Sequence, residues 1–261
     1  MDAKTDDRLG EPDSGEMNGL MTRLMVGVNG QAFRSLGNRV ISGPFAGMVI
    51  PSVTPWSDGN FSVKLLGIYE FELHDSMVHA AWRQPRVVVN VGCAEGYYAV
   101  GLARMISSAE IFAFDVSGDS RNVCSKYAFE NGVGDRVRVA GGCDLPYELS
   151  VTDAPSGHRL YVVDVEGAER TLLDLKQCPV LKNSDVIVEC HDFLDRDVSC
   201  DLADRFSSTH RVELILSKIP RLDQFPFLSG SPTIMLALMA VEKRPVPCCW
   251  LACWANQRGV N

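Results

Sequence analysis

One segment constrains the fold of this chain most strongly. It is a run of β-branched residues that is followed by glycines and then by a helical pattern of apolar residues. Residues 86–104 read Arg-Val-Val-Val-Asn-Val-Gly-Cys-Ala-Glu-Gly-Tyr-Tyr-Ala-Val-Gly-Leu-Ala-Arg. The valines between positions 87 and 91 suit a strand that is buried on both faces of a sheet. Gly92 and Gly96 allow the backbone to approach a ligand that a Cβ would block. The segment predicts a strand, a tight turn and a helix N-terminus, which together can cradle a nucleotide-like group.

A second strand is expected at residues 110–115, one crossover helix beyond Gly96, and it ends in a carboxylate. In a right-handed βαβ unit the tip of this strand lies beside the first glycine turn, where an acid can accept hydrogen bonds from both ribose hydroxyls. Asp115 is therefore the predicted ribose ligand. The alternative is that Asp115 caps the following helix, because Ser117 and Asp119 come next.

The amino-acid composition and net charge exclude several classes of protein and of binding partner. A chain of 261 residues, 46% of them hydrophobic, can bury a full core as one domain with appendages. The net charge of -8 gives no general support for binding a nucleic-acid backbone. Nine irregularly spaced cysteines and the lack of a basic-then-apolar N-terminal signal predict a reducing, cytoplasmic location. The apolar stretch at residues 233–241 is too short to span a bilayer, so no membrane partner is expected.

The organisation along the chain follows from local composition and periodicity. Residues 1–18 hold six acids and two bases, and this composition predicts a disordered tail. Residues 19–83 are expected to form an N-terminal cap with a lead-in helix over 69–82. The main domain is predicted at residues 84–243. The C-terminal extension, residues 244–261, contains a cysteine- and tryptophan-rich segment that is expected to form a small apolar patch.

Alternating strand and helix patterns fill the main domain. Further strands are expected at residues 136–140, 159–165 and 185–190, with helical segments between them. The last two strands, 210–216 and 233–241, have no helix-length segment between them and are expected to pair antiparallel. This pattern predicts an α/β fold of the Rossmann-like type, a three-layer sandwich around a mostly parallel sheet whose last strand is antiparallel.

Acidic residues follow the third and fourth expected strands, at the edge where open α/β sheets bind ligands. Asp144 is placed to meet an adenine edge or an amine, or is a loop carboxylate. Asp164 and Glu166 sit two apart and so share a face, whereas helix capping explains Glu169. Capping does not explain Asp164, because an unpaired carboxylate inside the apolar run Tyr-Val-Val-Asp-Val is costly. Asp164 is therefore a predicted functional residue.

Glu189 and His191 share a face at the tip of the fifth expected strand. A histidine in this position can take up a proton near neutral pH. The alternatives are a metal ligand and a histidine–glutamate pair that only braces two strand ends.

Two motifs resemble a known family. Asn-Val-Gly-Cys-Ala-Glu-Gly at 90–96 resembles the first motif of class I S-adenosylmethionine-dependent methyltransferases. Val-Asp-Val-Glu-Gly-Ala-Glu at 163–169 resembles the signature of the FkbM family within them. The similarity extends from about residue 43 to at least residue 192. It implies a seven-stranded sheet with the seventh strand reversed, S-adenosylmethionine as cofactor, and methyl transfer to a hydroxyl of a sugar or other small natural product.

The positions of the glycine turn and the strand ends, together with the resemblance, indicate which residues hold the cofactor. They are Asn90, Gly92, Glu95, Gly96, Asp115, Asp144 and Asp164. The chain departs from the first motif, which normally opens with an acid and has a central glycine, at Asn90 and Ala94. Asparagine can still hydrogen-bond the cofactor's ammonium or an ordered water, but it loses the charge attraction, which nearby Glu95 would restore.

A sulfonium methyl group is already activated, so the protein mainly aligns an acceptor oxygen and removes one proton. His191 is the predicted base, with Glu189 orienting it. Asp164 is expected to position the acceptor or the methionine end, and Glu166 to assist. The predicted site contains no metal; the alternative is a divalent-metal site of Asp164, Glu189 and His191 that lowers the pKa of a hydroxyl.

Two other functions remain open at this point. A nicotinamide-dependent oxidoreductase uses a similar glycine turn and ribose acid, but its fingerprint has glycine near Ala94 and does not predict the Asp164 segment. A binding protein that kept the fold and lost catalysis is also compatible with Asn90. The sequence identifies neither the acceptor nor the oligomeric state.

Overall fold

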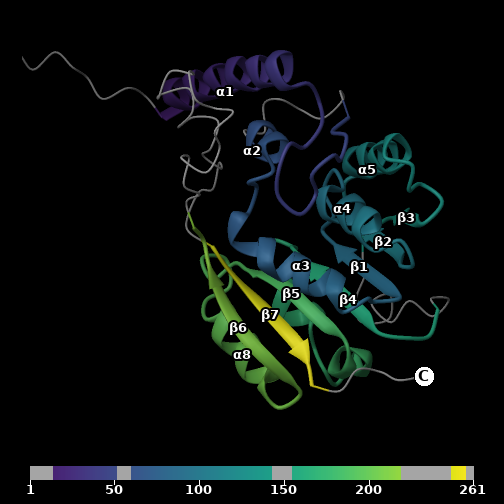
Figure 1. Cartoon of the computed structure of the whole chain (residues 1–261). Coiled ribbons are helices and arrows are strands. Elements are labelled where there is room, and N and C mark those ends of the chain that lie inside the picture. Colours follow the sequence, from purple (N-terminus) through teal and green to yellow (C-terminus); the bar gives the residue numbers. More distant parts are fainter. Residues whose placement is uncertain (1–13, 52–59, 143–154, 219–247, 257–261) are drawn as a thin grey trace, which may run out of the picture.

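The computed structural model describes residues 14–51, 60–142, 155–218 and 248–256. Within this part of the chain, seven strands form one sheet in the order β3-β2-β1-β4-β5-β7-β6. They are β1 (Val87–Val91), β2 (Glu110–Phe114), β3 (Val137–Ala140), β4 (Arg159–Val163), β5 (Asp185–Cys190), β6 (His210–Leu216) and β7 (Cys249–Ala255) (Figure 1). Strand β7 runs antiparallel to both of its neighbours, and the other pairs are parallel. The predicted seven-stranded, mostly parallel sheet is confirmed.

Helices cover both faces of this sheet. On one face lie α3 (His74–Trp82), α4 (Tyr97–Met105) and α5 (Gly118–Glu130). On the other lie α7 (Glu169–Leu172), the short 3₁₀ helix η2 (Pro179–Asn183) and α8 (Val198–Ser207). Alternate residues of β1 belong to the two cores, since Val88 packs in the first and Val87 and Val89 in the second. The three-layer sandwich and the doubly buried first strand are therefore both as predicted.

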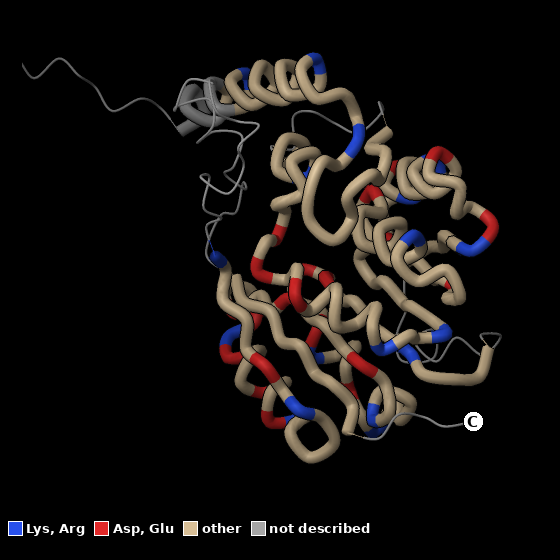
Figure 2. Tube along the Cα trace, in the orientation of Figure 1, with Lys and Arg blue, Asp and Glu red and all other residues tan. Residues whose placement is uncertain are grey.

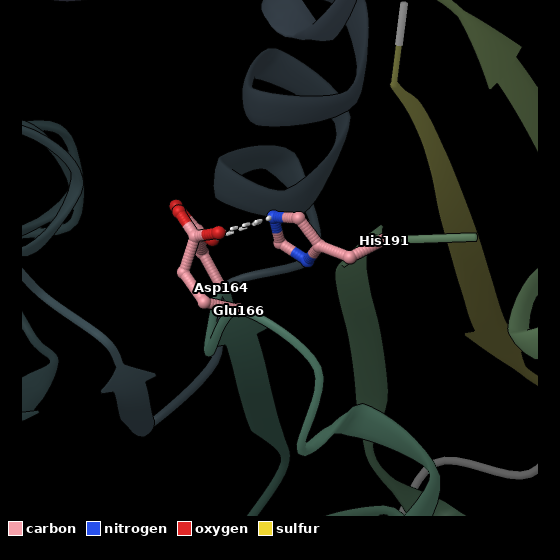
Figure 3. Close-up of side chains that lie close together, drawn as sticks. All are labelled: Asp164, Glu166 and His191. Atoms are coloured by element: carbon pink, nitrogen blue, oxygen red, sulfur yellow. Dashed lines mark ion pairs between the residues drawn. The ribbon is translucent and has the colours of Figure 1, made fainter. Parts of the chain in front are cut away.

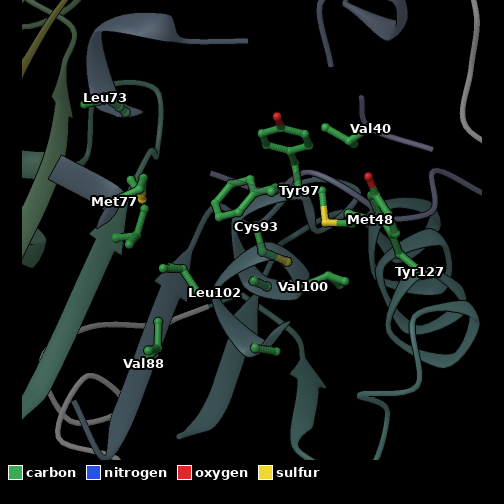
Figure 4. Close-up of a cluster of buried hydrophobic side chains, with 14 of the residues drawn as sticks. Val40, Met48, Leu73, Met77, Val88, Cys93, Tyr97, Val100, Leu102 and Tyr127 are labelled. Carbon is green, nitrogen blue, oxygen red and sulfur yellow. The ribbon is translucent and has the colours of Figure 1, made fainter. Parts of the chain in front are cut away.

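The N-terminal segment packs into the first of these cores. It comprises α1 (Ser14–Leu36), α2 (Phe61–Leu66) and the 3₁₀ helix η1 (Phe71–Leu73). Figure 4 shows Val40 and Met48 from this segment gathered with Val88 of β1 and Leu102 of α4. The expected cap is thus continuous with the main hydrophobic core. A disordered tail was expected over residues 1–18, but helix α1 begins at Ser14, so residues 14–18 are helical. Residues 1–13 lie outside the described residues.

The last strand of the sheet differs from the prediction. It was expected at residues 233–241, which lie outside the described residues, and the structure places it at Cys249–Ala255. This segment was expected to be a small apolar patch within a C-terminal extension, 244–261. Instead β7 lies between β5 and β6 and is buried over nearly its whole length. A strand with two paired neighbours and two covered faces is apolar throughout, which is why its sequence does not alternate. The main domain therefore extends to Ala255, beyond the predicted boundary at 243.

A buried ionic cluster joins four segments at the amino end of the sheet. Oδ2 of Asp185, the first residue of β5, accepts hydrogen bonds from Nε of Arg83 at 2.5 Å and from Nε2 of His158 at 2.6 Å. Its Oδ1 accepts one from the backbone N–H of Ala255 at 3.0 Å. Asp185 therefore ties the start of β5 to the end of β7 and to the chain segments that precede β1 and β4.

Figure 2 shows acidic and basic residues interspersed along the described chain. This distribution agrees with the net charge of -8. Among the described helices, none has the length and apolar character needed to cross a membrane.

Candidate active site

A cavity of about 500 Å³ opens at the carboxyl ends of the parallel strands. Its walls come from the ends of β1, β2 and β4, from the segment after β3 and from α7. Of the predicted site residues, Gly92, Asp115, Asp164 and Glu166 line it. The volume is within the range of small-molecule sites, and the position is the one at which open α/β sheets bind ligands.

The glycine turn after β1 is held against β2 and β4. The backbone N–H groups of Gly92 and Cys93 both donate to the carbonyl oxygen of Phe114, each at 2.9 Å. Gly92 has φ of 74°, and a Cβ at this position would lie 1.6 Å from the carbonyl oxygen of Asp164. Only glycine fits here, because the ends of β1 and β4 approach so closely.

Asp115 fastens the same turn from the tip of β2. Its Oδ2 accepts a hydrogen bond from the backbone N–H of Ala94 at 2.8 Å, and its Oδ1 accepts one from that of Ser117 at 2.8 Å. The N-cap of α5 is Ser117, whose hydroxyl accepts from the N–H of Ser120. Asp115 is therefore not the helix cap. Its carboxylate lies in the cavity wall, where the ribose ligand was predicted.

Three of the other predicted cofactor residues are absent from the described cavity lining. Asn90 is buried in β1, where its Nδ2 donates to the carbonyl of Val162 at 3.2 Å. Glu95 forms a buried ion pair with Lys64 of α2. Burial alone would raise the pKa of Glu95, but the charge of Lys64 lowers it. Gly96 faces α5, since a Cβ there would lie 2.7 Å from Sγ of Cys124. Thus Glu95 is already neutralised by a partner within the protein.

The fourth, Asp144, lies outside the described residues. Its expected role at an adenine edge or amine stays a prediction.

The predicted catalytic residues come together at the ends of β4 and β5. We refer to Asp164, Glu166, Glu189 and His191 as the carboxylate–histidine cluster. Nε2 of His191 lies 3.7 Å from Oδ1 of Asp164, 3.5 Å from Oε2 of Glu166 and 3.7 Å from Oε2 of Glu189. Figure 3 shows the carboxylates of Asp164 and Glu166 side by side, both directed at this nitrogen. His191 is buried, whereas Glu166 is 75% exposed at the open side.

The partner of the other imidazole nitrogen, Nδ1, differs from the one predicted. Nδ1 of His191 donates a hydrogen bond to Oε1 of Glu169 at 2.5 Å. The same carboxylate oxygen accepts from the backbone N–H of Gly167 at 3.1 Å. Glu169 was attributed to helix capping and Glu189 was expected to orient the histidine. The structure assigns the orienting contact to Glu169, while Glu189 lies on the Nε2 side.

Burial and mutual charge shift the ionisation of this group. Burial raises the pKa of Asp164 to about 6. Burial alone would lower the pKa of His191, but the hydrogen bond to Glu169 and the surrounding negative charges raise it. For Glu169, burial is outweighed by the hydrogen bonds from His191 and Gly167, which lower its pKa. The structure therefore favours an anionic Glu169 beside a readily protonated imidazole.

Comparison with known proteins gives similarities of architecture only. No family model matches the sequence, and no curated protein matches it. Among solved structures, the O-methyltransferase TomG from Streptomyces achromogenes, in complex with SAM, is 13% identical, with 92% of this chain and 96% of that one covered and a TM-score of 0.49. The O-methyltransferase from Bacillus cereus, in complex with SAH, is 12% identical, with 90% of each chain covered and a TM-score of 0.47. An rRNA methylase from Streptococcus thermophilus is 11% identical, with 71% of this chain and 97% of that one covered and a TM-score of 0.46.

Proposed function

We propose that the chain is an S-adenosylmethionine-dependent methyltransferase that methylates a hydroxyl group of a small molecule such as a sugar or another natural product. One observation carries the proposal. The cavity at the carboxyl ends of the strands has the Asp115 carboxylate in one wall and the Asp164–Glu166 segment, backed by His191, in another. A nucleoside and a proton-accepting group can thus be held in one space.

The residues present fit this cofactor. Each Asp115 oxygen accepts one backbone hydrogen bond and keeps a further lone pair for a ribose hydroxyl. Oδ1 of Asn90 is buried without a hydrogen-bond partner among the described residues, so it can accept a hydrogen bond from an ordered water behind the cavity wall. Asp164, at the boundary between cavity and cluster, is the candidate for the methionine end or the acceptor.

When bound, the cofactor supplies a methyl group that its sulfonium has already activated. The chain has to hold the acceptor oxygen in line and remove its proton. Nε2 of His191 can accept this proton when the imidazole is neutral, because Glu169 keeps the remaining ring proton on Nδ1. Glu166 is exposed, so it can assist by passing the proton to water.

Two observations bear on the alternatives. Asn90 lacks the charge of the usual first-motif acid and Glu95 is neutralised by Lys64, which makes a catalytically inactive binding protein with the methyltransferase fold the second candidate. An oxidoreductase gives no role to the four carboxylates around His191. The net charge of -8 gives no general support for a nucleic-acid acceptor, so a small-molecule acceptor is preferred.

Calorimetry with S-adenosylmethionine, S-adenosylhomocysteine and NADH tests the proposal. We expect both methionine-derived ligands to bind, and Asp115→Ala to weaken this binding at least tenfold. Asp119→Ala is the matched control, because this acid is exposed four positions further on, in the first turn of α5. Binding that is unchanged in Asp115→Ala, or binding of NADH alone, would refute the assignment. Binding without turnover on any hydroxyl acceptor would favour the second candidate.

A further inference from the structure

The distances from Nε2 of His191 to the carboxylates of the carboxylate–histidine cluster are longer than hydrogen bonds. Nitrogen–oxygen hydrogen bonds are typically about 2.9 Å long. The three carboxylate oxygens lie 3.5–3.7 Å from Nε2 of His191. Two ligand atoms about 2.1 Å from one octahedral cation are about 3.0 Å apart when adjacent and about 4.2 Å when opposite. The observed distances exceed the adjacent spacing by about 0.5–0.7 Å, so small side-chain movements would bring these donors around a common cation.

One of the donor atoms is buried without a hydrogen-bond partner. Oδ1 of Asp164 has no such partner among the described residues. Buried polar atoms without partners are uncommon in proteins and indicate an additional bound group. His191 is only 3% exposed, and the hydrogen bond from its Nδ1 to Glu169 leaves Nε2 facing the same carboxylates. A cation bound here would satisfy the Asp164 oxygen and contact Nε2 at the same time.

The histidine is supported in the way that metal-binding histidines are. Such residues donate their second ring N–H to a carboxylate or carbonyl, which fixes the tautomer and turns the other nitrogen toward the metal. Here Glu169 takes the N–H of Nδ1 and is itself held by the backbone N–H of Gly167. Glu169 is completely buried, so this support is rigid and shielded from water.

We propose that Asp164, Glu166 and His191 bind a divalent cation, with Glu189 as a further ligand and Glu169 supporting the histidine. The donor atoms of the first three residues all lie within 4.8 Å of one another (Figure 3). They come from the ends of two adjacent strands, β4 and β5, which pair directly in the sheet. This arrangement differs from the metal site considered from the sequence, because Glu166 takes part and Glu169 acts through the histidine.

The donor set indicates the kind of metal. Carboxylate oxygens suit Mg²⁺ and Mn²⁺, and the imidazole favours Mn²⁺ of the two. The site borders the cavity, because Asp164 and Glu166 also line it. If the proposed function holds, an acceptor hydroxyl bound to the cation would lose its proton to water more readily. His191 is then a metal ligand and not the base.

Manganese binding to the chelator-treated full chain, followed by electron paramagnetic resonance and calorimetry without cofactor, tests this inference. We expect one Mn²⁺ per chain. Glu166→Gln, Asp164→Asn and His191→Ala should each lower the affinity at least tenfold, and Glu169→Gln about ten- to hundredfold. Glu166→Gln is the safest variant for the fold, since this side chain is 75% exposed. Glu213→Gln, a partly exposed acid on β6, is the control and should bind Mn²⁺ normally.

Absence of saturable binding by the wild-type chain at millimolar Mn²⁺ would overturn the proposal. So would binding that persists unchanged in Glu166→Gln, Asp164→Asn and His191→Ala, because the ion would then lie elsewhere. Each variant is compared with the wild-type chain by circular dichroism, so that loss of binding is not mistaken for unfolding. Since no cofactor is present, failure here leaves the binding of S-adenosylmethionine untouched, and failure of cofactor binding leaves the metal site untouched.

Discussion

Oε1 of Glu169 and Nδ1 of His191 are 2.5 Å apart, although the residues are 22 positions apart in the chain. Glu169 is the first residue of α7 and His191 directly follows β5, so the contact joins the two segments that carry the carboxylate–histidine cluster. Both side chains are buried, and water does not compete for the bond. The contact gives the imidazole a single orientation, with Nε2 toward Asp164 and Glu166.

The first prediction follows from this contact. Glu169→Gln keeps an oxygen that can accept from Nδ1 and from the Gly167 N–H, but it removes the charge. We expect turnover to fall about ten- to hundredfold while the dissociation constant of the cofactor stays the same, because Glu169 acts only through His191. Steady-state kinetics and calorimetry measure these two effects, and the downfield proton signal of the His191 Nδ1–H should move. Unchanged turnover together with an unchanged proton signal would show that the charge has no positioning role.

The sequence predicted where the chemistry gathers but not how the histidine is held. Strand ends carrying Asp164 and His191 could be placed together because parallel strands present their carboxyl ends at one edge. Glu169 was missed because an acid in the first turn of a helix is normally explained by capping and the helix dipole. Only the packing of α7 against the sheet shows that this acid is buried beside His191.

The last strand was misplaced for a related reason. Two apolar runs follow residue 230, and neither alternates, since a central strand is buried on both faces. Periodicity cannot choose between such runs. The choice depends on which one pairs with β5 and β6, and that is decided by long-range contacts.

The second prediction concerns the approach of β1 to β4. Gly92→Ala places a methyl group 1.6 Å from the carbonyl oxygen of Asp164, so the strand ends would have to separate. Gly132→Ala is the matched control, because Gly132 also has a positive φ but a Cβ there would meet nothing within 4 Å. We expect the control to lose about 1 kcal/mol of unfolding free energy, the usual strain of a left-handed backbone, and Gly92→Ala to lose several times more or fail to fold. Urea denaturation measures both; equal losses would contradict the predicted clash.

The third prediction is a dependence of stability on pH that arises from Asp185. Burial alone would raise the pKa of Asp185, but hydrogen bonds from His158 and Arg83 lower it. The carboxylate therefore stabilises the fold above its unfolded-state pKa of about 3.9, and this contribution is lost as the pH falls through the lower folded-state value. Asp185→Asn should be less stable than wild type by about 3–5 kcal/mol at pH 7, since it leaves Arg83 without its buried partner. Urea denaturation at pH 7 and below pH 4 should show this difference shrinking in acid. A difference that is equal at both pH values would exclude Asp185 as the titrating group.

The last prediction tests His191 itself. His191→Ala should lower turnover far more than cofactor affinity, because its Nε2 faces Asp164 and Glu166 and not the predicted ribose ligand Asp115. Loss of a general base typically costs about a hundred- to ten-thousandfold in rate. A chelator separates the two roles of the residue. The wild-type rate should not change with chelator if Nε2 is the base. If Nε2 is a metal ligand, the rate should fall with chelator and recover when Mn²⁺ is added.

His210→Ala is the matched control, because His210 is equally buried, donates from Nε2 to the backbone carbonyl of Ser184, and lies in β6. That variant should melt at a lower temperature and keep its rate while folded. If His191→Ala behaves in the same way, the histidine only braces the ends of β4 and β5, and Glu166, the exposed carboxylate beside the cavity, becomes the candidate base.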